Sequence, residues 1–223
     1  YNVLCAWALQ RYGAVTGDER YIDAATRVGE AAVRQQKANG WVADNCLDDA
    51  DRPLTHTIGY TLQGLLETGL GLGRQDFVDA AVRGIAPLMD LISANGFLHG
   101  RYHDDWRAGC FWSCLTGNAQ LAIVAYRLFE VTGERDYLTF ADRLCNFLKT
   151  LQALDSPNPA LNGCLAGSYP ILGSYMVGGY PNWATKYFLD ALMLQDRLSG
   201  SEQPAKVHET ELPAASTPTP AML

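Results

Sequence analysis

The sequence predicts an all-α fold, a partial α/α toroid of about three and a half helical hairpins. Three stretches repeat a glycine, a polar triplet, an aromatic residue and an Ala-rich helix; they span residues 16–42, 72–98 and 132–152. A second type of helical segment alternates with them, and only the short pieces GWVA and GFLH suggest strands. Two-helix units of this length are typical of rings in which outer helices surround inner ones.

Turn residues mark the two ends of each unit. A glycine begins each unit, and the matching glycines stand at positions 17, 73, 133 and 200. An Asn-Gly pair closes each unit, at 39–40, 95–96 and 162–163. Because Asn-Gly favours positive φ, we expect each pair to end a helix or to make a tight turn.

We expect seven helices, four of the inner type and three of the outer type. The inner helices are expected at about 2–15, 54–70, 115–131 and 182–198. A ring of six hairpins at this spacing needs more than about 300 residues, whereas this chain has 223. Because a half ring leaves apolar inner faces uncovered, we expect N-terminal hairpins missing from this chain, or a partner, to complete the ring.

Composition bounds the domains and the partners. Residues 1–200 form one toroid domain, and residues 201–223 are Pro- and Thr-rich without periodicity, which predicts a disordered tail. The net charge is −7 and the 17 basic residues are scattered, which argues against nucleic acid. The chain has no run of about 18 apolar residues, which argues against a membrane span.

The chain contains six cysteines, at positions 5, 46, 110, 114, 145 and 164. Cys5 and Cys145 stand in apolar helical runs, where a free thiol packs as a small hydrophobe. A chain of this size with a large core does not depend on disulfides. We therefore expect reduced thiols and a cytoplasmic location.

The long connections are expected on one end of the ring. They lead from an outer to an inner helix and span residues 40–54, 96–114 and 163–181. Loops held by a rigid scaffold carry most binding and catalytic residues. The first loop contains NCLDDADRPLTH, residues 45–56. Its aspartates indicate an acidic site, or alternatively a solvated loop in which Asp51 or Thr55 caps the next helix.

One inner helix has a polar stripe opposite its apolar face. His56, Tyr60, Gln63 and Glu67 recur at helical spacing. Such a pattern suits an inner helix whose polar side lines a central cavity. His56 is then a general base or ligand at the cavity mouth, or alternatively a hydrogen-bonded interior histidine.

Aromatic residues and carboxylates in these loops favour carbohydrate chemistry on a glycan or uronate-type sugar, without a cofactor. Glycosidases use two carboxylates, whereas epimerases and lyases move protons with His, Tyr or Arg. The acid/base candidates are His56, Asp48, Asp49, Asp104, Asp105 and Tyr60. The substrate-binding candidates are Arg101, Trp106, Trp112, Tyr175, Asn118 and Trp183. His56 with Asp48 or Asp49 is the first choice for the reaction.

Two other hypotheses stay open. Cys46, His56 and Cys114 offer three ligands and an open position, as catalytic zinc requires, and Cys110 or Cys164 could replace one of them. No CxxC motif supports zinc, and the same thiols can be incidental. The third hypothesis is a scaffold or glycan-binding protein that performs no chemistry.

Three segments carry a resemblance to a known group of proteins; they are PLTHTIGYTLQGLLETG, WSCLTGNAQLAI and GSYPILGSYMVGGYPNWATKYFLDALML. They resemble bacterial α/α-toroid proteins tied to polysaccharide biosynthesis. The broader relatives of that group are the six-hairpin glycosidases and the terpenoid cyclase and prenyltransferase toroids. The resemblance covers residues 1 to about 198 and implies the toroid fold.

The resemblance implies less about the reaction. Zinc-dependent toroids use Asp/Cys/His or Cys/Cys/His ligands, and WSCLTG is loosely similar to the Trp-Cys-x-Gly motif of lanthionine cyclases. The Cys-His-Gly motif of those cyclases and the DxDD motif of terpene cyclases are both absent. Six-hairpin glycosidases place paired acids at the cavity mouth, which the loop carboxylates of this chain would permit.

Overall fold

The computed structural model describes residues 2–199, so the predicted tail and the role of Gly200 lie outside the described residues. Within that range the chain forms seven α-helices, which confirms the predicted number. They are α1 (Val3–Thr16), α2 (Glu19–Gln35), α3 (Thr55–Leu72), α4 (Gln75–Leu91), α5 (Leu115–Thr132), α6 (Arg135–Leu151) and α7 (Asn182–Ser199). A short 3-10 helix, η1 (Pro159–Leu161), lies between α6 and α7.

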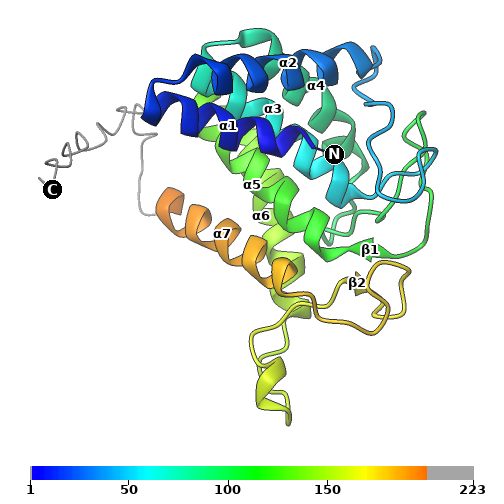
Figure 1. Ribbon diagram of the computed structural model, residues 1–223. Coiled ribbons are helices and arrows are strands. Elements are labelled where there is room, and N and C mark those ends of the chain that lie inside the picture. The colour runs from blue at the N-terminus through cyan, green and yellow to red at the C-terminus, as the bar shows by residue number, and fades with distance from the viewer. Residues whose placement is uncertain (1, 200–223) are drawn as a thin grey trace, which may run out of the picture.

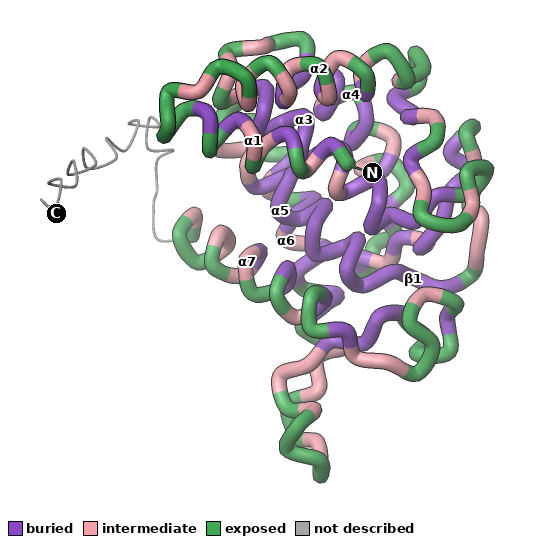
Figure 2. The backbone as a smooth tube through the Cα atoms, in the orientation of Figure 1, coloured by how far each residue is buried: buried purple, intermediate pink, exposed green. Residues whose placement is uncertain are grey.

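The helices form two layers of a partial ring. Helices α1, α3, α5 and α7 pack side by side in that order, and α2, α4 and α6 pack behind them (Figure 1). Helices α3 and α5 are buried along most of their length because neighbours cover both flanks and the outer side (Figure 2). The partial α/α toroid predicted from the repeat is confirmed, and α1 and α7 are its two edges.

Amphipathic outer helices close the core. Helix α4 buries Phe77, Val78, Ile85 and Leu88 and exposes its polar side, as the helical spacing of its apolar residues requires. Cys145 is fully buried in α6, as predicted, whereas Cys5 on the edge helix α1 is exposed, so the prediction of a packed thiol is wrong there.

Glycines end the inner helices. Gly17, Gly73 and Gly133 follow α1, α3 and α5 in the left-handed conformation, with φ of 70°, 64° and 74°. The Asn-Gly glycines also have positive φ but make turns beyond the outer helices. At Gly40 a Cβ atom would lie 2.1 Å from the carbonyl oxygen of Arg83, so this turn also needs the missing side chain.

Short extended pieces tie the loops together. Strand β1 (Ser113–Cys114) pairs antiparallel with β2 (Ser168–Tyr169). The pieces GWVA and GFLH do not form strands, and Val42 makes only an isolated bridge. Helix α3 begins after Leu54 without a side-chain cap, so the alternative in which Asp51 or Thr55 caps it is wrong.

Candidate functional site

The three predicted loops gather on one side of the molecule (Figure 1, right), whereas the segment that contains η1 projects away at the bottom. We call this surface the loop face; it comprises residues 36–54, 92–114 and 163–181. Backbone hydrogen bonds join the connections where the inner helices begin. The N–H of Thr55 donates to the carbonyl oxygen of Gly100 at 2.9 Å, and the N–H of Leu115 donates to that of Gly167 at 3.1 Å. The loop face is therefore one surface built on the N-terminal ends of the inner helices.

Each of the three connections contains one non-glycine residue with positive φ. These residues are Asp44 at 54°, Trp106 at 63° and Met176 at 54°. Such backbone persists only where surrounding contacts hold it, and it is enriched at functional sites. The bulky Trp106 is held by its indole N–H, which donates to the Asn39 carbonyl at 2.9 Å, and by an edge contact with Trp41.

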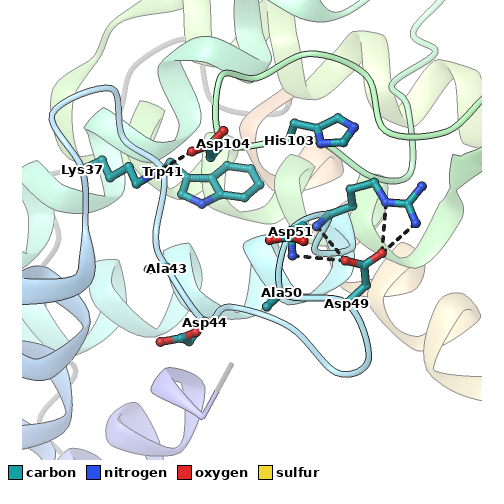
Figure 3. Close-up of a pocket in the computed structure, with 10 residues that line it drawn as sticks. Lys37, Trp41, Ala43, Asp44, Asp49, Ala50, Asp51, His103 and Asp104 are labelled. Atoms are coloured by element: carbon teal, nitrogen blue, oxygen red, sulfur yellow. Dashed lines mark hydrogen bonds and ion pairs between the residues drawn. The ribbon is translucent and has the colours of Figure 1, made fainter.

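The loop face contains a first cavity of about 620 Å³, which we call cavity A. It lies between the first two connections and is lined by Lys37, Trp41, Ala43, Asp44, Asp49, Ala50, Asp51, Arg52, His103 and Asp104 (Figure 3). The Lys37 ammonium donates to Asp104 at 2.7 Å, and this contact holds the pKa of that carboxyl below its usual range. Cavity A is predominantly acidic.

A second cavity of about 450 Å³, cavity B, lies beside the first. It is lined by Asp48, Asp49, Arg52, Arg101, Gly109, Cys110, Phe111, Trp112 and Ser174. Phe111 is 83% exposed, which is unusual for a large apolar side chain. Cavity B therefore combines an exposed ring with charged groups of both signs.

The charged groups of cavity B form two ion pairs. Arg101, which is only 8% exposed, donates to Asp48 at 2.7 Å and to the carbonyl oxygen of Arg52 at 2.7 Å. The Arg101 bond holds the pKa of Asp48 below its usual range. Burial raises the pKa of Asp49, but hydrogen bonds from Arg52 outweigh it, so this pKa is lowered too. Both carboxylates are ionised at neutral pH.

His56 lies at the start of α3 and lines neither cavity. It is 5% exposed, and its Nδ1 lies 2.8 Å from Oε1 of Gln120 on α5. Burial lowers the pKa of His56 to about 4, although the Gln120 hydrogen bond opposes the shift. The imidazole is therefore neutral at neutral pH.

Aromatic rings surround His56. The ring of Tyr60 meets it edge-on at a centroid distance of 4.7 Å, and the ring of Tyr175 lies at 5.5 Å. Tyr175 also packs against the apolar cluster of Trp112, which lines cavity B, and its hydroxyl accepts a hydrogen bond from the Trp183 indole at 2.8 Å. Burial raises the pKa of Tyr175 to about 12 and also raises that of Tyr60.

The predicted site residues thus fall into two neighbouring groups. Asp48, Asp49, Arg101 and Trp112 share cavity B, whereas His56, Tyr60, Tyr175 and Trp183 form the aromatic cluster. Tyr175 contacts both groups, so the two lie next to each other.

Four predicted residues lie in neither group, and one of them, Asp104, lines cavity A. Trp106 is buried against Trp41, Asp105 accepts a hydrogen bond from the backbone of Arg107, and Asn118 is buried with its amide donating to Ser113. Trp106 thus packs against Trp41, which lines cavity A, without lining the cavity itself.

Sequence reasoning missed Gln120, Phe111 and Arg52. The available signal for Gln120 was a second amide side chain in the mostly apolar segment LTGNAQLAI, two positions after Asn118. No sequence signal indicated that Phe111 is exposed while the adjacent Trp112 is buried.

The zinc alternative requires at least three donor side chains close together. Among residues 2–199, no three His, Cys, Asp or Glu side chains gather closely enough to hold a metal ion. Cys114 is fully buried, and this burial raises the pKa of its thiol to about 12. Cys46, His56 and Cys114 therefore do not fit a zinc ion.

A third cavity of about 450 Å³ lies on the concave side of the ring; we call it the lumen groove. It is lined by residues of all four inner helices, among them Trp7, Gln63, Glu67 and Arg127. Glu67 accepts from Arg127 at 2.7 Å. Gln63 and Glu67, the second half of the polar stripe of α3, thus face the concave side, as the spacing indicated, whereas His56 does not line this groove. In the described range, no helix is long and apolar enough to cross a membrane.

No protein-family model and no curated protein matches this chain. Solved structures do match it. An unsaturated glucuronyl hydrolase from Bacillus sp. GL1 has a TM-score of 0.68 and 16% identity over 87% of this chain and 58% of that one. A GH76 α-mannanase from Bacteroides thetaiotaomicron has a TM-score of 0.65 and 11% identity over 88% of this chain and 51% of that one. A cellobiose 2-epimerase from Spirochaeta thermophila has a TM-score of 0.62 and 12% identity over 86% of this chain and 52% of that one.

These similarities establish the α/α-toroid fold. The chain spans between about half and three fifths of the length of those structures. Two hydrolases and an epimerase share the fold, so the fold alone does not determine the reaction.

Proposed function

We propose that this chain binds, and by acid/base chemistry processes, a glycan or uronate-type sugar at its loop face. One observation carries the proposal: in cavity B the exposed Phe111 stands beside the ion pairs of Asp48 and Asp49 with arginines. Sugar hydroxyls and carboxylates suit charged hydrogen-bonding groups, and an aromatic ring suits the apolar face of a sugar. The glycan-directed names of the structural neighbours support the same class.

The protonation states favour one kind of chemistry. A glycosidase needs a carboxylic acid whose pKa is raised, whereas the pKa values of Asp48, Asp49 and Asp104 are all lowered. A neutral His56 beside the protonated Tyr60 offers a base and an acid instead, and Tyr175 connects this pair to Trp112 in the wall of cavity B. This arrangement favours proton transfer, as in a lyase or epimerase, over hydrolysis by two carboxylates.

The ring around this site is incomplete in the described residues. Helix α7 exposes Leu189 and Met193, and α1 exposes Val15. We propose that further hairpins or a partner cover these edges. The sequence resemblance adds polysaccharide biosynthesis to this proposal, and the expected reduced thiols add a cytoplasmic location.

Calorimetric titration with neutral and uronate-containing oligosaccharides tests the binding. We expect a uronate-containing ligand to bind, and Phe111→Ala to weaken it at least about fivefold, because stacking on an aromatic ring contributes about 1 kcal/mol. Leu154→Ala is the matched control, because Leu154 is also strongly exposed but lines neither cavity. Absence of sugar binding would leave the scaffold hypothesis.

Turnover is tested separately with the ligand that binds. We expect His56→Gln to abolish product formation while binding in cavity B changes less than twofold, because His56 lies outside that cavity. Unchanged turnover in this variant would remove His56 from the reaction. Binding without turnover in the native chain would make it a glycan-binding protein.

A further inference from the structure

Cavities A and B have a common wall. Of the residues that the structure describes, Asp49 and Arg52 alone line both of them. Figure 3 shows Asp49 at the edge of cavity A, with dashed lines to the groups that it binds. The two cavities are therefore neighbouring parts of one groove that crosses the loop face.

The common wall is fixed in place. One carboxylate oxygen of Asp49 accepts the backbone N–H groups of Asp51 and Arg52, both at 3.1 Å. The other oxygen lies 2.9 Å from the Arg52 guanidinium, which also reaches the carbonyl oxygen of Gly109 in the second connection at 3.5 Å. The Arg52 and Asp49 side chains stay partly exposed, so both can face a ligand on either side.

The two parts of the groove differ in charge. In cavity A, Lys37 and Arg52 face four carboxylates, those of Asp44, Asp49, Asp51 and Asp104, which leaves a net charge of −2. In cavity B, Arg52 and Arg101 balance Asp48 and Asp49, which leaves no net charge. An anionic group is therefore repelled from cavity A but can bind the guanidinium groups of cavity B.

The apolar surfaces are also divided between the two parts. Cavity B is lined by the exposed ring of Phe111 and by Trp112, and cavity A is lined by Trp41. Each volume lies within the range of small-ligand pockets, so neither part needs the other to hold one sugar unit.

We propose that cavities A and B are two subsites of one groove for a glycan of at least two units. The unit that bears a carboxylate lies in cavity B, and a unit without an acidic group lies in cavity A. Arg52 lies between them and donates to both. This inference rests on the proposed glycan function. It adds a minimum length for the glycan and the order of its charged and uncharged units along the groove.

Calorimetry with four saccharide probes of defined charge tests the length of the ligand and the order of its units. The probes are a uronate monosaccharide, a uronate–hexose disaccharide, a diuronate and a neutral disaccharide. We expect the uronate–hexose probe to bind about tenfold more tightly than the monosaccharide, because a second unit gains contacts without a second binding step. The diuronate should gain nothing over the monosaccharide.

A charge variant of cavity A tests the order directly. Asp44→Asn with Asp51→Asn removes the net charge, and asparagine tolerates the positive φ of Asp44. We expect this variant to bind the diuronate roughly three- to tenfold more tightly, an effect that salt weakens. Asp23→Asn with Asp136→Asn makes the same charge change at the other ends of the outer helices and should leave binding unchanged.

The outcomes separate the two proposals. Absence of binding by every probe overturns the proposed function itself. A monosaccharide that binds as tightly as the uronate–hexose probe overturns only the two-subsite groove. Equal diuronate binding by the cavity A variant and the native chain overturns the assignment of charge to the two subsites.

Discussion

Nδ1 of His56 lies 2.8 Å from the side-chain oxygen of Gln120, across the contact between α3 and α5. Because a carbonyl oxygen can only accept, Nδ1 carries the proton and Nε2 keeps its lone pair. Gln120 thereby fixes the tautomer that can act as a base. The same bond joins two helices whose contributing residues are 64 positions apart.

The burial of His56 makes stability depend on pH. Its pKa is about 4 in the folded chain and about 6.5 when unfolded, so between these values the unfolded state binds more protons. The contribution of His56 to stability is therefore complete above pH 6.5 and is lost as pH falls through that window, by at most about 3 kcal/mol.

Urea unfolding at pH 7 and pH 5 measures this effect. We expect His56→Gln to lose less stability than the native chain over this interval. His103→Gln is the control, because His103 lies in the open cavity A and should leave the dependence unchanged. An identical pH dependence in the native chain and the His56 variant would show that His56 is not buried as a neutral base.

Gly117 allows the close approach that places His56. A Cβ atom on Gly117 would lie 2.3 Å from the Thr55 hydroxyl and 2.6 Å from the backbone nitrogen of His56. We expect Gly117→Ala to lower the free energy of unfolding by about 1–3 kcal/mol, because the backbone of α3 must shift. Val131→Ala, on the exposed side of α5, should change stability by less than about 0.5 kcal/mol.

The Arg101–Asp48 pair should respond asymmetrically to mutation. Arg101→Ala leaves the Arg52 carbonyl without its donor, so we expect a loss of about 1–3 kcal/mol in thermal or urea unfolding. Asp48→Asn removes an exposed partner and should cost less than about 1 kcal/mol. Equal losses from the two substitutions would contradict a buried arginine with a surface carboxylate.

Treatment with a metal chelator should not change the stability of the protein. Since the thiols of the described chain do not gather with His56, we expect less than about 0.1 zinc per chain and no change of the melting temperature with a chelator. Elemental analysis of the purified protein measures the zinc content, and thermal unfolding with and without the chelator measures the melting temperature. About one zinc per chain that disappears in Cys114→Ser would restore the zinc hypothesis.

The helical architecture could be predicted because its signals are local. Apolar spacing, the glycine after each inner helix and the Asn-Gly turns each act within a few residues. The strands could not be predicted, because two residues carry no periodicity and Ser113 pairs with Tyr169, far along the chain.

The site could be predicted only in part. The polar stripe from His56 to Glu67 could be recognised because its spacing lies within a single helix. It correctly indicated that part of α3 faces the concave side. The partners Gln120 and Arg101 lie 64 and 53 positions from His56 and Asp48, so only packing brings them together. The burial of Trp112 beside the exposed Phe111 likewise depends on which loop segments meet.

The five tryptophan indole N–H signals in a nitrogen–proton NMR spectrum test the location of glycan binding most directly. Trp41 and Trp112 line cavities A and B, whereas Trp7 lines the lumen groove. On titration with a uronate–hexose disaccharide, we predict shifts for Trp41 and Trp112 and none for Trp7. A shift of Trp7 alone, with Trp41 and Trp112 unmoved, would contradict a glycan site on the loop face.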